Sequence, residues 1–252
     1  MKFQGLVLAG GEGSRMRADG VVDTKALVTI GGRPQARLVL EALAAVGCET
    51  LTCAARDDAP GLLAALESWR FSVPFRVVPC RTPTSLHTFV EGLNAAPPGP
   101  VLCSMVDTVM RPEDWRAVAG QAAARLSEGA FVVLAVTSFV NDKSGLYVTR
   151  AATGDVVAFE QAPGAAPWVT GGVYALGPAV RPLAEEALRL GVSRMRGFLD
   201  WLVRRKVRVA AIEVPRIIAV GVFAVLRKLD GKAAIRRFVL ARHVALDDVA
   251  SV

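Results

Sequence analysis

The chain opens on the stretch FQGLVLAGGEGSRM, residues 3–16, in which an apolar run passes directly into a glycine-rich turn. A short and almost continuous apolar run is typical of a strand that is buried on both faces of a parallel sheet. Glycines at positions 10, 11 and 13 allow positive φ and let backbone N–H groups approach an anion without a Cβ in the way. Because Arg15 and Lys25 follow, the stretch predicts a strand that ends at a phosphate-binding loop.

Two common phosphate-binding motifs are excluded at this turn. No Gly-Lys-Ser or Gly-Lys-Thr follows, so the loop is not a Walker A motif, and Met16 stands where a dinucleotide-binding fingerprint has its third glycine. The alternative interpretation is a tight strand-to-helix turn with two incidental cations. It would have to explain the glycines, Arg15 and Lys25 separately.

Apolar runs alternate with helix-period segments through the first 137 residues. The runs that predict further strands are residues 51–55, 75–78, 101–106 and 131–137. The segments that predict helices are residues 34–46, 60–69, 85–95 and 112–127. This alternation predicts an α/β fold with a Rossmann-like mixed, mostly parallel sheet flanked by helices. Shorter strand-like pieces at 146–149, 156–160 and 172–176 predict a small antiparallel elaboration over that sheet.

The positive charge is concentrated in the last quarter of the chain. From Arg189 to Val252 there are 14 Lys and Arg residues against 5 Asp and Glu residues. Such a segment could meet nucleic acid or an anionic membrane, but solvated helix faces and a positive rim around a phosphate site are the favoured explanation. The apolar run 217–226 is too short for a membrane span, which needs about 20 residues, and predicts a buried strand that runs into a helix.

The cysteines and the N-terminal residues indicate a cytoplasmic protein. Cys48, Cys53, Cys80 and Cys103 form neither a CxxC pair nor a Cys/His cluster, so we expect buried free thiols. No apolar targeting segment precedes Gly10.

The motifs together resemble the signature of the sugar-phosphate nucleotidyltransferases, the nucleoside-diphosphate-sugar pyrophosphorylase family that includes molybdenum-cofactor guanylyltransferase-like proteins. The resemblance is carried by residues 8–16, by Lys25 and by Gly31-Gly32-Arg33-Pro34 ahead of a helix. It implies transfer of an NMP group from an NTP to a sugar phosphate or related phosphorylated acceptor, with release of pyrophosphate. It implies catalytic roles for Arg15 and Lys25. The residues that it places on the nucleotide are Leu8, Ala9, Gly10, Gly11, Gly13 and Ser14.

Asp107 is the candidate metal ligand. It ends the apolar run 101–106, and ligands of open α/β sheets bind at the carboxyl ends of strands. A carboxylate there suits Mg²⁺, which neutralises a triphosphate during nucleotidyl transfer. The resemblance implies the same role. The alternative is that Asp107 caps the helix that begins near Pro112.

Thr84 and Ser85 stand where the family turns into a helix that faces the base and the acceptor. The resemblance therefore implies that both contact nucleotide or substrate, although their hydroxyls also suit a helix N-cap. His87 could touch a phosphate, but a single histidine inside a helix is more often a structural donor.

The acceptor side departs from the family pattern. The resemblance places substrate contacts at Glu160 and Gly172. Many members carry a lysine at the position of Gln161, and that lysine binds the sugar phosphate. A neutral amide can hydrogen-bond a sugar or polyol, but it offers no charge to a phosphate.

A second departure comes near the C-terminus. Many relatives carry an Asp-x-Asp whose carboxylate completes the metal site, and the matching positions here are Ala219 and Gly221. Three explanations follow: Asp107 suffices, Asp200 or Asp230 substitutes, or catalysis is lost. A catalytically silent regulator that binds nucleotide or sugar phosphate is thus the main alternative to an enzyme.

We expect one domain over residues 1–252, with a nucleotide-binding half (1–140), a substrate-binding half (141–226) and a basic tail (227–252). The expected partners are an NTP, a phosphorylated small molecule, Mg²⁺ and a second copy of the chain in a homodimer. No nucleic acid is expected, and membrane docking through the tail is the weaker alternative. The sequence does not decide between CTP, GTP, UTP and ATP.

Overall fold

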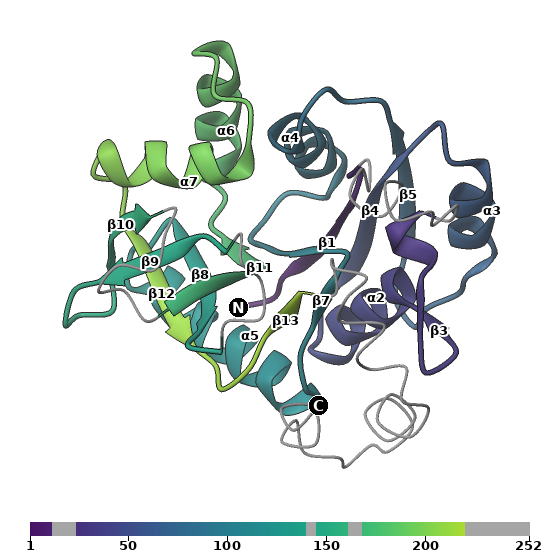
Figure 1. Ribbon diagram of the computed structural model, residues 1–252, viewed down its shortest axis with the longest axis horizontal. Coiled ribbons are helices and arrows are strands. Elements are labelled where there is room, and N and C mark those ends of the chain that lie inside the picture. The colour runs from purple at the N-terminus through teal and green to yellow at the C-terminus, as the bar shows by residue number, and fades with distance from the viewer. Residues whose placement is uncertain (12–23, 140–144, 161–167, 220–252) are drawn as a thin grey trace.

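The computed structural model describes residues 1–11, 24–139, 145–160 and 168–219 (Figure 1). Its strands are β1 (Gln4–Ala9), β2 (Thr29–Ile30), β3 (Arg33–Pro34), β4 (Thr50–Arg56), β5 (Phe75–Cys80), β6 (Val101–Met105), β7 (Thr108–Val109), β8 (Val132–Thr137), β9 (Tyr147–Arg150), β10 (Val156–Glu160), β11 (Trp168–Leu176), β12 (Val209–Glu213) and β13 (Ile218–Ala219). Its helices are the 3₁₀ turn η1 (Lys25–Leu27), α2 (Gln35–Ala45), α3 (Pro60–Ser68), α4 (Ser85–Ala95), α5 (Pro112–Ser127), α6 (Val180–Arg189) and α7 (Met195–Arg204).

The centre of the main sheet is parallel, as predicted. Strands β6, β1, β4 and β5 lie side by side in that order, and each neighbouring pair is parallel. All six residues of β1 are buried, because helices cover both faces of the strand. Its side chains alternate between the two layers: Val7 and Ala9 pack on one face, and Leu6 and Leu8 on the other.

The strand order creates a natural place for a ligand. The chain moves outward from β1 to β4 and β5, then returns to place β6 on the opposite side of β1. In open α/β sheets, the crevice at such a reversal lies outside the carboxyl ends of the two flanking strands and is where ligands bind. The residues that follow β1 and β6 are Gly10 and Asp107 with their neighbours, so the two predicted sites share one edge of the sheet.

The antiparallel strands extend the sheet, whereas the sequence pattern suggested that they lie over it. Strand β11 pairs antiparallel with β6, β8 and β9, and β9 pairs with β10. Strand β12 then joins β8 in parallel. Because each of these strands has a ladder partner in the main sheet, the elaboration forms an edge of that sheet (Figure 1).

Two helical layers enclose the sheet. Helices α2, α3 and α5 supply apolar side chains to one core, and α4, α6 and α7 supply them to the other. The apolar positions of α7 are Met195, Phe198, Leu199 and Leu202, which recur at helical spacing and are buried. The opposite side of α7 is left to face solvent or a ligand.

Helix α5 excludes one interpretation of Asp107. The helix begins with Pro112 in its first turn, and its N-cap residue is Arg111. Asp107 lies four residues before this cap, in the turn between β6 and β7. The predicted N-cap role of Asp107 is therefore wrong.

The structure also bears on the expectations about the cysteines and the apolar run 217–226. The four cysteines are buried free thiols, as predicted. Within the described residues, no helix has both the length and the apolar character to cross a bilayer. Ile217 and Ile218 are buried where the apolar run 217–226 begins; the rest of that run and the basic tail lie outside the described residues.

Candidate active site

A cleft of about 980 Å³ opens beyond the carboxyl end of β6, with α7 and the loop before it as the opposite wall. Its floor comes from the middle of β11, where Gly171 and Gly172 lie. In Figure 1, α7 and α6 stand on one side of this region and the parallel strands on the other. Pockets that hold small ligands occupy about 300 to 1,000 Å³, so the cleft has room for a nucleotide-sized molecule.

Lys25 and Asp107 form an ion pair in this cleft, through Lys25 Nζ and Asp107 Oδ2. Lys25 is the first residue of η1, whereas Asp107 follows β6. The turn at Asp107 is tied to β1 by a hydrogen bond from Val106 N–H to the Leu8 carbonyl at 3.2 Å. Because 26% and 14% of the two side chains are exposed, solvent screens the pair only in part. The structure thus brings the predicted catalytic lysine to the predicted metal ligand.

The carboxylate of Asp107 fits a Mg²⁺ ion that arrives with phosphate groups. Among the described residues, no three or more His, Cys, Asp or Glu side chains gather where they could hold a metal ion. Mg²⁺ is nevertheless commonly bound by one or two carboxylates, with substrate phosphates and water as the other ligands. Asp107 could supply that one carboxylate if Lys25 turned toward a phosphate.

Strand β13 passes directly beside this site. It pairs antiparallel with β7, so that Ala219 lies opposite Thr108, the residue after Asp107. Ala219, at the position where the resemblance implies a carboxylate, thus lies beside the turn that holds Asp107. Asp200 lines the same cleft but is ion-paired with Arg204 at 2.7 Å. Gly221 and Asp230 lie outside the described residues.

Gly10 is required by packing. A Cβ at this position would lie 2.6 Å from Cγ2 of Thr88 on α4, which is too close. At Gly11 a Cβ would meet nothing within 4 Å. Neither glycine has positive φ, so that part of the prediction is wrong for both.

The remaining predicted nucleotide contacts are only partly described. Leu8 and Ala9 are buried in β1, with 3% and 5% of their surface exposed, so their side chains face the core. A ligand could reach only their backbone. Gly13, Ser14 and Arg15 lie outside the described residues.

Thr84 and Ser85 bind protein backbone. The Thr84 hydroxyl donates to the carbonyl of Ser193, and Ser85 Oγ accepts a hydrogen bond from Met195 N–H at 3.1 Å. Thr84 is the N-cap residue of α4 but makes no side-chain capping bond, so the predicted cap is wrong. Of the two, Ser85 lines the cleft.

His87 has a structural role, in agreement with the simpler expectation. Its Nδ1 lies 2.8 Å from Thr84 Oγ1. Since Thr84 uses its own proton on the Ser193 carbonyl, the imidazole Nδ1–H must donate to Thr84.

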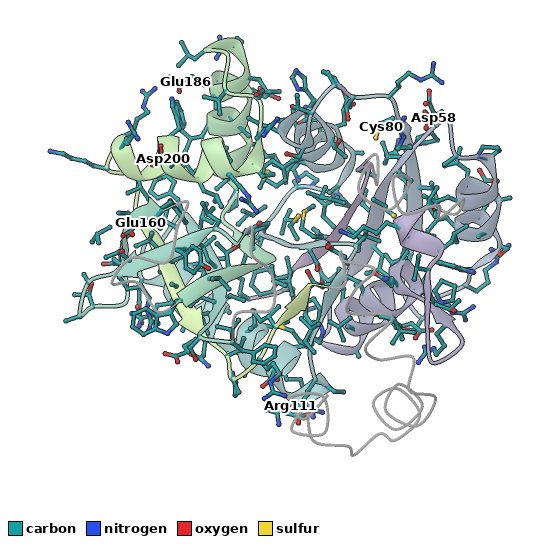
Figure 2. All side chains as sticks on the ribbon, in the orientation of Figure 1. Asp58, Cys80, Arg111, Glu160, Glu186 and Asp200 are labelled. Atoms are coloured by element: carbon teal, nitrogen blue, oxygen red, sulfur yellow. The ribbon has the colours of Figure 1, made fainter. Side chains whose placement is uncertain are left out.

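Of the two residues predicted to contact the acceptor, one lines the cleft and the other does not. Gly172 lines the cleft, but its identity is explained by φ +76° and by a Cβ position only 2.8 Å from Met105 Cγ. Glu160 accepts a hydrogen bond from the Thr149 hydroxyl at 2.7 Å and is not among the described residues that line the cleft. Figure 2 shows Glu160 on the β10 side and Asp200 on α7. Gln161 lies outside the described residues.

Arginines on the α7 wall are the site residues that the sequence interpretation missed. Arg194, Arg196 and Arg204 all line the cleft. Arg204 is paired with Asp200, whereas Arg194 makes no side-chain hydrogen bond or ion pair with any described residue. The available signal was the sequence Arg194-Met195-Arg196 at the start of an amphipathic helical pattern. The sequence pattern alone places these arginines only within the basic excess of the last quarter of the chain.

No cysteine is poised as a nucleophile. Burial raises the pKa of the Cys48 and Cys53 thiols to about 12 and also raises that of Cys103. Burial likewise raises the pKa of Tyr174, a cleft residue, to about 12. All four groups are therefore neutral at physiological pH, and the charges of the cleft come from its Lys, Arg and Asp side chains.

Three solved structures share this architecture at low sequence identity. A protein assigned as a glucose-1-phosphate thymidylyltransferase from Bacillus anthracis, in complex with sucrose, has a TM-score of 0.76 and 16% identity, with 92% of this chain and 95% of that chain covered. The inositol-1-phosphate CTP transferase from T. maritima has a TM-score of 0.69 and 17% identity, with 86% and 87% covered. A UDP-glucose pyrophosphorylase complexed with UDP-glucose has a TM-score of 0.71 and 14% identity, with 89% and 95% covered.

Comparison at the level of sequence families is more decisive. No curated protein matches the chain closely enough to count as a relative. The family model of the MobA-like NTP transferase domain matches residues 5–246, which is nearly the whole length. The chain therefore belongs to the MobA-like NTP transferase domain family.

Proposed function

We propose that this protein transfers an NMP group from an NTP to a phosphorylated small-molecule acceptor and releases pyrophosphate. The observation that carries the proposal is that one cleft contains both the Lys25–Asp107 pair and the arginines of the α7 wall. A lysine on one side of the cleft and arginines on the other suit a reaction that brings together two phosphorylated molecules. Membership of the family supports the same reaction class.

In this proposal, the acceptor phosphate binds at Arg194 and Arg196. A guanidinium group offers several donors in a planar fork and matches a phosphate better than an amide does. The arginines would supply the positive charge that Gln161 lacks. Arg194 is the better placed of the two, since no described side chain already neutralises it.

The chemistry requires no covalent enzyme intermediate. An oxygen of the acceptor phosphate attacks the α-phosphorus of the NTP, and the new P–O bond forms as the bond to pyrophosphate breaks. Lys25 would stabilise the charge near the α-phosphate, and the arginines would hold the attacking oxygen in line. Mg²⁺ held by Asp107 would neutralise part of the triphosphate charge.

The acceptor is proposed to be a sugar phosphate or a polyol phosphate. Similar structures belong to proteins named for glucose 1-phosphate, inositol 1-phosphate and UDP-glucose. Gly172, Asp200 and Trp201 line the cleft, and in this proposal their polar groups bind hydroxyls of the acceptor.

A catalytically silent binding protein is the second candidate. Two observations favour it: Lys25 already balances the charge of Asp107, and the strand beside that site carries Ala219 opposite Thr108. Such a protein would bind a nucleotide or a sugar phosphate without turnover.

A pyrophosphate-release assay with four NTPs, Mg²⁺ and a panel of sugar and polyol phosphates tests the proposal. Release with one pair, lost in Lys25→Ala and Asp107→Ala but kept in Lys2→Ala, would support it. Lys2 is a matched control because it pairs with Glu49 in an exposed ion pair at 2.9 Å. No release from any pair, together with a nucleotide-dependent rise in melting temperature, would favour the binding protein.

A further inference from the structure

The start of α4 and the start of α7 are joined by three hydrogen bonds. Met195 N–H donates to Ser85 Oγ at 3.1 Å, across a separation of 110 residues. Leu86 N–H donates to the Ser193 carbonyl at 3.3 Å, and the Thr84 hydroxyl donates to the same oxygen. Segments far apart in the chain are thus held together beside the cleft.

Helix α7 lacks an N-terminal cap from its own sequence. The first N–H groups of any helix have no partner within the helix, and a neighbouring Ser, Thr, Asp or Asn usually accepts from one of them. The N-cap residue here is Arg194, which makes no side-chain capping bond and whose guanidinium cannot accept one. Ser85 of α4 satisfies the N–H of Met195 instead.

This bond lies between two of the arginines that line the cleft. Arg194 and Arg196 are the residues on either side of Met195. Holding the Met195 amide therefore fixes the backbone from which both guanidinium groups extend.

The rest of α7 is docked independently of Ser85. Phe198 is fully buried, and its ring lies 6.0 Å from that of Phe89 on α4. Leu199 and Leu202 are also buried in the same core. Loss of the Ser85 hydroxyl should therefore loosen the first turn of α7 without undocking the helix.

We propose that Ser85 is a positioning residue that caps α7 from another helix and thereby holds Arg194 and Arg196 where they bind a phosphate. This inference rests on the proposed function, which places the acceptor phosphate at these arginines. The first turn of α4 also touches the glycine turn, because Thr88 packs against Gly10. Ser85 thus belongs to a turn that contacts both the glycine turn after β1 and the start of α7.

Inorganic phosphate is the probe for the test, titrated into the full-length protein and followed by backbone amide NMR shifts. In Ser85→Ala the dissociation constant for phosphate should rise about 3- to 10-fold, the effect of one lost hydrogen bond. Ser85→Thr keeps an oxygen at the same position and should restore affinity to within about twofold of wild type. Ser127→Ala is the matched control, because the Ser127 hydroxyl donates to the Ala123 carbonyl of its own helix at 2.9 Å, away from the cleft.

Hydrogen exchange of the Met195 amide provides a readout that does not depend on any ligand. The amide should exchange faster in Ser85→Ala than in wild type and should be protected again in Ser85→Thr. Equal protection in Ser85→Ala would overturn the inference.

The phosphate titration separates the inference from the proposed function. If Arg194→Ala loses phosphate binding while a folded Ser85→Ala keeps wild-type affinity, Ser85 does not position the arginine and the inference is wrong. If both Ser85→Ala and Arg194→Ala bind phosphate with wild-type affinity, the acceptor phosphate does not bind at Arg194. The proposed acceptor site is then wrong, and the inference fails with it.

Discussion

The two walls of the cleft carry charge in different ways. Lys25 and Asp107 lie on the wall at the carboxyl end of β6, here called the β6 wall. They neutralise each other, and only 26% and 14% of their side chains are exposed. On the α7 wall, Arg204 and Asp200 are paired at exposures of 78% and 36%, and Arg194 adds a cation that no described residue neutralises. One wall is balanced and half-buried, and the other is positive and solvated.

This difference indicates separate roles. A half-buried pair has to be rearranged before either member can act on a ligand, which couples ligand binding to a local change. A solvated cation can attract an anion at once but gains little from burial. The β6 wall is therefore suited to chemistry, and the α7 wall to capture of the acceptor.

The largest effect is expected on the β6 wall. Lys25→Met and Asp107→Asn should each lower kcat for pyrophosphate release by about 100-fold or more, the usual loss when one electrostatic stabiliser of a transition state is removed. Steady-state kinetics would measure this, with Lys2→Met as the control. Turnover retained in both variants would remove the distinction between the walls.

A second prediction concerns how the β6 wall is held in place. Gly10→Ala should lower the free energy of unfolding by about 1 to 3 kcal/mol, because its Cβ would overlap Thr88. Gly11→Ala, which meets open space, should change it by less than about 0.5 kcal/mol. Urea denaturation would measure both. Because Thr88→Ala makes room, it should suppress much of the Gly10→Ala loss; full additivity of the two variants would contradict the packing explanation.

On the α7 wall, the expected effect is on binding. Arg194→Ala should raise the KM for the acceptor about tenfold, as expected for lost charge-assisted hydrogen bonds, while the KM for the NTP changes by less than about twofold. Arg189→Ala, an exposed arginine at the end of α6, is the matched control. A fall in kcat with an unchanged acceptor KM would place Arg194 in the chemistry instead.

The smallest effects should appear in stability, through two double-mutant cycles. The coupling energy of Lys25 with Asp107 should be about 1 kcal/mol, whereas that of Asp200 with Arg204 should be at most about 0.5 kcal/mol, because the latter pair is more exposed. Urea unfolding at low salt and at about 1 M salt would compare them, since screening acts mainly on the exposed pair. Equal couplings would show that the walls do not differ in this way.

Local pattern was enough to predict most of the first half of the fold. Strands β1, β4, β5 and β6 and helices α2 to α5 lie within about two residues of their predicted bounds, because each has its own apolar period and turn residues. The position of Asp107 at the ligand-binding edge of the sheet could be predicted as well, because it follows β6, but its ion pair with Lys25 was not predicted.

The acceptor side could not be predicted in this way, because its residues depend on contacts between distant segments. The hydroxyls of Thr84 and Ser85 find partners at residues 193 and 195, about 110 positions further along the chain. The glycine at position 171 is explained by Ile217, whose Cγ2 would be only 2.2 Å from an added Cβ. Neither partner can be identified from spacing in one sequence.

The hydrogen bond between Met195 and Ser85 also has a consequence for folding. Closing a loop of 110 residues costs chain entropy that local contacts do not, so bonds of this kind form late and only on an assembled scaffold. We therefore expect α7 to acquire its finished first turn after the parallel strands and α4 have come together. A nascent chain would then form the Lys25–Asp107 site first, and the arginine site that attracts the second molecule would be the last to mature.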